Sequence, residues 1–154
     1  MEAPQLIAAV EALQPDATVR QPCDRPTLVV PAAALLTLLP RLRDDPALRL
    51  DLLETHTAID WIDEERFELL YLLTSIVHRH HLTLSVSVPR AEPVVPTVRS
   101  VYPIAEFLER EVYDMFGILY DDHPDLRRLF LEDDWVGFPL RKDYEDDFML
   151  ERPE

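Results

Sequence analysis

The sequence predicts an α+β fold: a single domain with a mainly antiparallel sheet, flanking helices and a long irregular C-terminal strap. Three observations predict it. In residues 82–88 apolar and polar side chains alternate as in a strand, and in residues 104–116 apolar side chains recur with a helical period. From Ile118 onward neither pattern continues for more than a few residues. The expected element order α-β-β-α-β-β-β-α implies one mixed domain. We therefore expect a core domain over residues 1–117 and an extended partner-binding segment, the strap, over residues 118–154.

Two helices and two short strands are expected in the N-terminal part. Residues 3–13 carry a helical stripe of apolar side chains that Pro15 closes. Short strands are expected around residues 18–20 and 27–30. Residues 32–42 look helical, although Pro40 removes one hydrogen bond and kinks the last turn.

Three longer strands are expected over residues 48–59, 66–77 and 82–88. In the third, four aliphatic side chains alternate with hydroxyl side chains, so one face should be buried and the other, with Ser85 and Ser87, polar and outward. The step at residues 78–81 favours an antiparallel hairpin between the second and third strands. Its three histidines are expected in a solvated turn.

Prolines mark residues 89–96 as an extended connector before the last helix. In that helix one face carries the apolar residues, and Pro103 suits the first turn. Gly117 suits a left-handed stop. The apolar face consists of Ile104, Phe107, Leu108, Val112 and Met115.

Apolar residues in the strap follow neither a helical nor a strand period, yet the composition of the strap is not that of a disordered tail. Disordered segments are poor in aromatic residues, whereas interface centres are rich in aromatics and arginine. The alternative is that the aromatics pin the strap onto its own sheet. We favour a strap that lies along another protein. The residues concerned are Tyr120, Phe130, Trp135, Phe138, Tyr144 and Phe148, with Arg127, Arg128 and Arg141 interleaved.

Composition excludes several classes of protein. The net charge of −15 argues against binding to a phosphate backbone. Cys23 is the only cysteine, so this chain alone can form no disulfide and hold no iron–sulfur cluster, which needs about four thiolates. No stretch approaches the roughly 20 apolar residues of a membrane span, and no signal peptide is recognisable. We expect the chain on the cytoplasmic side.

Two acidic groups could be read as sites of chemistry. Glu109, Glu111 and Asp114 resemble an acid/base group, but an ion pair between Arg110 and Asp114 four residues on explains them on a helix surface. Glu111 and Asp114 would also attract an arginine from elsewhere, Arg127 or Arg128.

The second group follows the helix. Asp121, Asp122, His123 and Asp125 could hold a metal, but their spacing fits no zinc or calcium template. A turn in which His123 and Asp125 form hydrogen bonds is the favoured interpretation. We expect no catalytic, cofactor-binding or metal-binding residue in this chain.

Three segments together resemble the C-subunit family of complex I, the 30 kDa-type subunit of NADH:quinone oxidoreductase. They are EREVYDMFGI at residues 109–118, HPDLRR at 123–128 and GFPLRKDY at 137–144. Leu108, Asp122, Phe138 and Glu145 depart from common family residues and leave the branch of the family open. The resemblance implies a signature and partner interface at Glu109, Arg110, Glu111, Tyr113, Asp114, Phe116, Gly117, His123, Pro124, Asp125, Arg127, Arg128, Trp135, Gly137, Pro139, Arg141, Lys142, Asp143 and Tyr144.

The resemblance also implies a role. It is that of a cofactor-free peripheral-arm subunit of a proton-translocating respiratory enzyme, with FMN and iron–sulfur clusters in partner subunits. The implied partners are the large, hydrogenase-like D subunit and the cluster-bearing B subunit, and the membrane is reached only through them. One alternative is the equivalent subunit of a membrane-bound hydrogenase or formate-hydrogen-lyase complex. Another is a stand-alone metal-dependent hydrolase.

Overall fold

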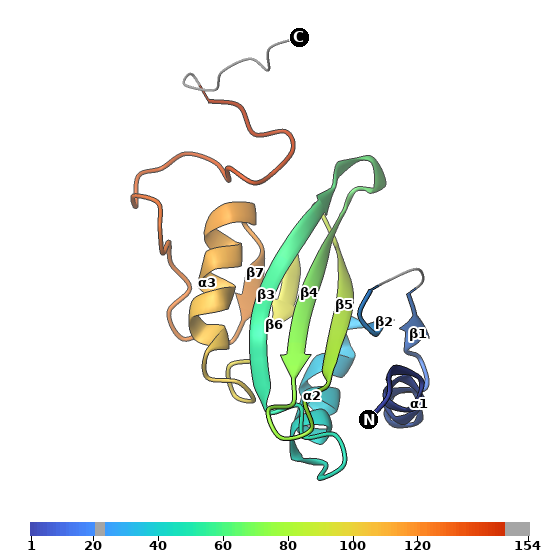
Figure 1. The fold of residues 1–154 in the computed structure, drawn as a ribbon. Helices are drawn as coiled ribbons and strands as arrows, with labels where there is room; N and C mark the ends of the chain where they lie inside the picture. Colours follow the sequence, from blue (N-terminus) through green and yellow to red (C-terminus); the bar gives the residue numbers. More distant parts are fainter. Residues whose placement is uncertain (21–23, 147–154) are drawn as a thin grey trace.

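A five-stranded sheet forms the centre of the computed structural model (Figure 1), which describes residues 1–20 and 24–146. Cys23 and Phe148 lie outside the described residues. The elements are α1 (Ala3–Leu13), β1 (Thr18–Val19), β2 (Thr27–Val29), the 3-10 turn η1 (Ala32–Ala34), α2 (Leu35–Asp44), β3 (Leu52–Trp61), η2 (Ile62–Glu64), β4 (Arg66–Thr74), β5 (His81–Pro89), β6 (Val94–Pro96), α3 (Ala105–Phe116) and β7 (Leu119–Asp121).

The strands of the sheet lie in the order β1-β2-β5-β4-β3. β3, β4 and β5 are consecutive antiparallel neighbours, and β1 is antiparallel to β2. Within the described residues of this sheet, β2 and β5 form the one parallel pair. The prediction of an α+β domain with a mainly antiparallel sheet is confirmed, as is the hairpin between β4 and β5.

The core forms on one face of this sheet. Alternate residues of β4 and β5 point into it because successive strand side chains face opposite sides. Buried leucines of α2, Leu6 and Val10 of α1, and Val112 and Phe116 of α3 belong to the same cluster. The β4 and β5 members are Phe67, Leu69, Tyr71, Leu73, Leu82, Leu84, Val86 and Val88.

The opposite face of β5 differs from the prediction. Ser85 is buried and donates a hydrogen bond to Glu68 at 2.6 Å, while Arg20 pairs with the same carboxylate. This ion pair shields the middle of the polar face from water, and of its three hydroxyl side chains Thr83 and Ser85 are buried while Ser87 is exposed. At the end of the hairpin, His80 is buried and its Nε2 donates to the carbonyl of Leu48 at 2.7 Å, so it is not part of a solvated turn.

Strand boundaries also differ. β3 begins at Leu52 rather than at residue 48, because Arg49 has a φ of +41° that a strand does not allow. β4 ends at Thr74 rather than at residue 77. The proline-rich connector contains β6, which pairs in parallel with β7 at the start of the strap. Three-residue strands carry too little alternation to be recognised in a sequence.

The predicted apolar face of α3 is buried only in part: Val112 lies in the core and Leu108 and Met115 pack against it. Ile104 and Phe107 are about half exposed, whereas Glu109, Arg110 and Asp114 are buried. The apolar pattern did not predict the buried charged side chains of α3. These side chains can lie on the inner face of the helix because they have partners elsewhere in the chain. Pro103 precedes the helix rather than lying in it, while Gly117 adopts the expected left-handed conformation at φ +71°. Among the described residues, no helix combines the length and apolar character needed to cross a bilayer.

Candidate interaction site: the strap and its anchor helix

The strap is held to α3 first by Asp114, which has no exposed surface. Its Oδ2 accepts the backbone N–H groups of residues 129, 130 and 131 at 3.0, 2.7 and 3.0 Å. Its Oδ1 pairs with Arg128 at 2.8 Å. Burial acts to raise the pKa of Asp114, but the hydrogen bonds from these three N–H groups and from Arg128 outweigh it and lower the pKa. One carboxylate therefore fixes four consecutive residues of the strap.

Arg110 holds the preceding part of the strap. Its guanidinium donates to the carbonyl oxygens of Arg127 at 3.2 Å and Arg128 at 2.9 Å. Upstream, His123 bonds through Nε2 to the Glu106 carbonyl at 3.1 Å, and its Nδ1 accepts the N–H of residue 125 at 3.1 Å. Because both ring nitrogens are engaged, this histidine acts as a turn residue.

Glu109 ties α3 to the loop after β6. Its carboxyl group accepts the hydroxyl of Thr97 at 2.5 Å and the N–H of Val98 at 2.8 Å. Burial raises the pKa of Glu109 to about 7, more than these two hydrogen bonds lower it. The side chain has no exposed surface, so it is structural.

A second attachment lies at the C-terminal end of α3. Arg141 donates from Nε to the carbonyl of Phe116 at 2.6 Å, and its guanidinium lies 4.7 Å from the ring centroid of Phe138 and 5.2 Å from that of Phe67. A Cβ on Gly117 would come within 2.5 Å of Phe138. Glycine is therefore required there both for its backbone conformation and for the contact with Phe138.

Asp60 of β3 provides the third attachment. Its buried carboxylate pairs with Arg90 at 3.0 Å and accepts the N–H of Lys142 at 3.0 Å. Arg90 also pairs with Asp143 of the strap at 2.5 Å. The strap is thus attached to the sheet as well as to α3.

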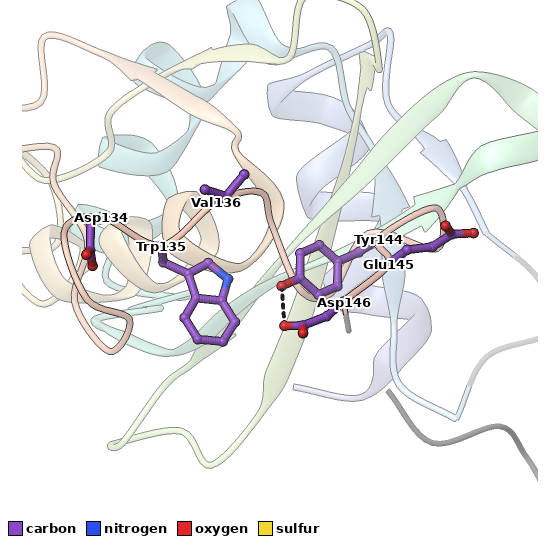
Figure 2. A pocket seen from close by; sticks show the side chains of 6 residues that line it. All are labelled: Asp134, Trp135, Val136, Tyr144, Glu145 and Asp146. Atoms are coloured by element: carbon purple, nitrogen blue, oxygen red, sulfur yellow. Dashed lines mark hydrogen bonds between the residues drawn. The ribbon is translucent and has the colours of Figure 1, made fainter. Parts of the chain in front are cut away.

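Beyond this attachment the strap folds back on itself. Tyr144 lies against Gly137, where a Cβ would come within 2.8 Å of its ring. Its hydroxyl donates to Asp146 at 3.0 Å. A hollow of about 660 Å³ opens here; Figure 2 shows its lining of Asp134, Trp135, Val136, Tyr144, Glu145 and Asp146.

Although Glu109, Arg110 and Asp114 are buried, several large apolar side chains of this region face solvent. The exposed fractions are 86% for Val136, 67% for Phe130 and 54% for Leu140. Trp135 is also exposed, as are Phe107 of α3 and Ile104, which caps this helix. Tyr120 is an exception among the strap aromatics: it is buried and bonds to His56 at 2.6 Å.

The predicted signature residues divide by exposure. Glu109, Arg110, Asp114, Phe116 and Gly117 are buried, and Tyr113, His123, Arg128, Gly137, Pro139, Arg141 and Tyr144 are half-buried. Glu111, Pro124, Asp125, Arg127, Trp135, Lys142 and Asp143 are exposed. In this conformation only the latter two groups have surface to offer a partner.

The sequence predicted two ion pairs that involve the acidic side chains of α3. The prediction of a surface ion pair between Arg110 and Asp114 is wrong, because both side chains are buried and each binds the strap. The expectation that Arg127 or Arg128 meets the acidic side chains of α3 is confirmed for Arg128 and Asp114.

The acidic loop forms a turn. Asp125 pairs with Arg127 at 2.9 Å, and no three His, Cys, Asp or Glu residues in the described part of the chain are placed to hold a metal ion. Asp60, Arg90 and Thr97 were not identified from the sequence, since only the fold brings them to the site.

The sequence profile of the family described as the respiratory-chain NADH dehydrogenase 30 Kd subunit matches residues 28–147. The chain belongs to this family. A relative from Moorella thermoacetica, named as the C subunit of NADH-quinone oxidoreductase, is 38% identical over 90% of this chain and 92% of its own length. One of the same name from Saccharopolyspora erythraea is 44% identical over 77% of this chain, which spans about half (48%) of that longer protein.

Solved structures share the 30 kDa subunit fold. One is a chain of the membrane-bound sulfane sulfur reductase, an archaeal respiratory membrane complex, with a TM-score of 0.80 and 26% identity, covering 94% of this chain and 86% of that one. The other is the trypsin-resistant fragment (1–134) of Nqo5, with a TM-score of 0.68 and 26% identity, covering 82% of this chain and all of the fragment.

Proposed function

We propose that this chain is the 30 kDa-type C subunit of a complex I-type NADH–quinone oxidoreductase and that it scaffolds the quinone-reducing module without catalysing a step. In this proposal residues 1–117 form the core domain and residues 118–154 the partner-binding segment. The partners are the large D subunit and the cluster-bearing B subunit. The chain lies on the cytoplasmic face, and FMN and iron–sulfur clusters are held by other subunits.

The observation that carries the proposal is the outward apolar surface of α3 and the strap. Phe130, Val136 and Leu140 extend from a segment whose backbone is fixed by buried charges. A side chain held in place loses little conformational entropy when a partner covers it, so this surface is preorganised for docking. Apolar and aromatic anchors of this kind dominate the energy of protein interfaces.

The test is co-expression with the D subunit and purification through it. Replacing both Phe130 and Val136 with serine should reduce recovery of the complex severely, because two anchors are lost at one interface. The matched control replaces Leu36 and Ile76, which are exposed elsewhere on the molecule, with serine and should assemble normally. Equal recovery of both double variants would contradict docking by the strap.

The absence of chemistry in this chain is tested separately. We expect the purified chain to be colourless and to have no quinone reductase activity. A cluster or flavin spectrum that persists through purification would contradict a cofactor-free role.

The likeness to a chain of the sulfane sulfur reductase complex favours a second candidate, the equivalent scaffold in a related respiratory complex or membrane-bound hydrogenase. The docking surface would be the same and only the neighbours would differ. Affinity purification from native membranes distinguishes them: flavin- and NADH-binding chains indicate complex I, and nickel–iron hydrogenase chains the alternative.

A further inference from the structure

The turn between β4 and β5, residues 75–80, carries large apolar side chains at a position where turns are usually polar. We call this turn the hairpin tip. Its residues Ile76 and Val77 are 65% and 56% exposed. Gly, Pro, Asn, Asp and Ser dominate turns, whereas β-branched side chains favour strands. The hairpin tip therefore presents an apolar surface that its own hairpin leaves uncovered.

The backbone of the hairpin tip is fixed by hydrogen bonds. The N–H of Ser75 donates to the carbonyl of His80 at 3.0 Å, and the N–H of Arg79 donates to the carbonyl of Ser75 at 2.8 Å. Arg79 is held at a φ of +54°, which is uncommon for a residue with a side chain. The N–H of Ile76 donates to the carboxylate of Asp51 at 3.3 Å. The turn is thus closed on itself and joined to the residue before β3.

Two histidines join the hairpin tip to the loop after α2. Nε2 of His78 donates to the carbonyl of Pro46 at 2.9 Å, and Nε2 of His80 donates to that of Leu48 at 2.7 Å. The two imidazole rings stack with their centroids 5.6 Å apart. Because the turn is held in place and β-branched side chains have few rotamers, the two aliphatic side chains lose little conformational entropy when a partner covers them. The hairpin tip is therefore preorganised for docking.

The charge of the hairpin tip indicates the chemistry of the partner. The guanidinium of Arg79 is exposed and forms no ion pair with a described residue. By contrast, Arg49 at the same end of the sheet pairs with Asp51 at 3.7 Å. A guanidinium binds a carboxylate through two parallel hydrogen bonds, and arginine is enriched among the residues that dominate interface energies. The matching surface is an apolar recess bordered by carboxylates.

Two other occupants match the hairpin tip less well. An anionic bilayer surface repels a chain whose net charge is −15. A second copy, related by two-fold symmetry at the tip, would bring two Arg79 side chains together. Two aliphatic side chains per copy also fall far short of the roughly 800 Å² that each partner buries in a stable dimer. A different protein with the complementary recess is the occupant that these observations favour.

The hairpin tip and the end of the described strap lie at opposite ends of the molecule. In Figure 1 the tip lies beside α2 at one end of the sheet, away from residues 135–146 of the strap. We propose that the hairpin tip docks into an apolar, carboxylate-bordered recess of a second neighbouring subunit, separate from the subunit that covers the strap. This inference goes beyond the docking of the strap and rests on the proposed function only in that the chain is assembled with other subunits.

The test measures how accessible the hairpin tip is in the assembled complex. Val77→Cys, in a chain in which serine replaces Cys23, provides a single thiol for a maleimide. Because interface centres exclude water, this thiol should react about tenfold or more slowly in the complex than in the isolated chain, both in native membranes and after purification in detergent. The matched control, Ala12→Cys at an exposed position of α1, should react at the same rate in all samples. Equal rates for Val77→Cys in the complex and in the isolated chain would overturn the proposal.

The chemistry of the recess is tested at Arg79. Arg79→Glu places a negative charge against the carboxylates of the partner and should restore the labelling rate of the isolated chain, whereas Arg79→Lys should retain most of the protection. Protection that survives Arg79→Glu would overturn the carboxylate-bordered recess. Protection that disappears when the intact complex is transferred to detergent would identify the bilayer as the occupant. Protection that appears in the isolated chain as its concentration rises would identify a second copy. Either result would overturn a protein recess.

Recovery of the D subunit separates the hairpin tip from the strap. The Arg79→Glu variant should be recovered through D in wild-type amounts, whereas the Phe130 and Val136 double variant should not. Loss of D from the Arg79→Glu variant would mean that one subunit contacts both ends, which overturns a separate neighbour. Normal recovery of the double variant together with a protected tip would contradict docking by the strap alone.

Discussion

The five-stranded sheet and the strap are stabilised by different means. In the sheet, alternating side chains such as Leu84 and Val86 enter a common core, and backbone groups pair from strand to strand. In the strap, the residues from 122 to 146 form no helix or strand, and its backbone groups are paired instead with side chains of α3. A chain without regular structure can be fixed when buried charged side chains replace the missing hydrogen-bond ladder.

The two regions also differ in their large apolar side chains. The face of the sheet that packs against α1 and α2 is covered by buried aliphatic side chains. Along α3 and the strap, Glu109, Arg110 and Asp114 are buried while Phe107, Phe130 and Val136 face solvent. In the proposed scaffold role, this apolar surface is the part of the molecule that a neighbouring subunit covers.

The largest effect on the strap is expected from replacing Asp114. Replacing it with alanine leaves a guanidinium and three backbone N–H groups without their acceptor, and the loss of one partner of a buried charge pair costs about 3–5 kcal/mol. We expect the strap to detach while the sheet remains folded. Limited trypsin digestion should then cut rapidly after Arg127 and Arg128, with the circular dichroism of the domain nearly unchanged.

Two variants serve as controls for that experiment. Asp114→Asn keeps an acceptor for the N–H groups and should lose less than the alanine variant. Asp143→Ala removes an exposed partner of Arg90 and should change the digestion rate much less. If Asp114→Ala unfolds the sheet together with the strap, the two regions are one cooperative unit and the comparison fails.

The next largest effect is the contribution of Glu109 to the free energy of unfolding, which depends on pH. Its folded-state pKa of about 7 lies above the 4.5 of an unfolded glutamate, so between these values the folded chain retains a proton that the unfolded chain has released. Stability from this group is therefore present below pH 4.5 and is lost as the pH rises to 7. The difference between 4.5 and about 7 corresponds to about 3 kcal/mol.

The measurement is urea unfolding of the isolated chain across this pH range. Glu109→Gln cannot titrate, so subtracting its profile from that of the wild type isolates the glutamate. The difference should decrease from pH 4.5 to 7 and then become constant. Identical profiles for the two proteins would show that this carboxyl group titrates like an exposed one.

The sheet and the strap also differ in how much of their structure could be predicted from the sequence. The strand over residues 82–88 and the left-handed Gly117 are local properties, and both were predicted correctly. The pairing of Asp114 with one of two arginines was also predicted, because helix geometry places two acids together. By contrast, the expected burial of Ile104 and Phe107 was wrong, because apolar periodicity assumes that apolar side chains are buried by their own domain.

The remaining errors concern contacts between distant residues. Asp60 meets the N–H of Lys142 across 82 positions, and Arg90 meets Asp143 across 53. Such pairs depend on the completed fold, and no spacing rule identifies them. The burial of Ser85 has the same origin, since it depends on Glu68 and Arg20 from other strands.

Substitution of Gly117 should have the smallest of these effects on stability, and it tests the junction between the sheet and the strap directly. In Gly117→Ala the new Cβ meets the Phe138 ring at 2.5 Å, in a conformation that costs about 1–3 kcal/mol for a residue with a side chain. Gly137→Ala, at φ +86°, imposes similar strain within the strap alone. We expect Gly117→Ala to lower both the melting temperature of the domain and the protection of Arg141 from trypsin, and Gly137→Ala to lower only the protection. Equal effects of the two on the melting temperature would mean that the strap contributes to the stability of the sheet throughout its length.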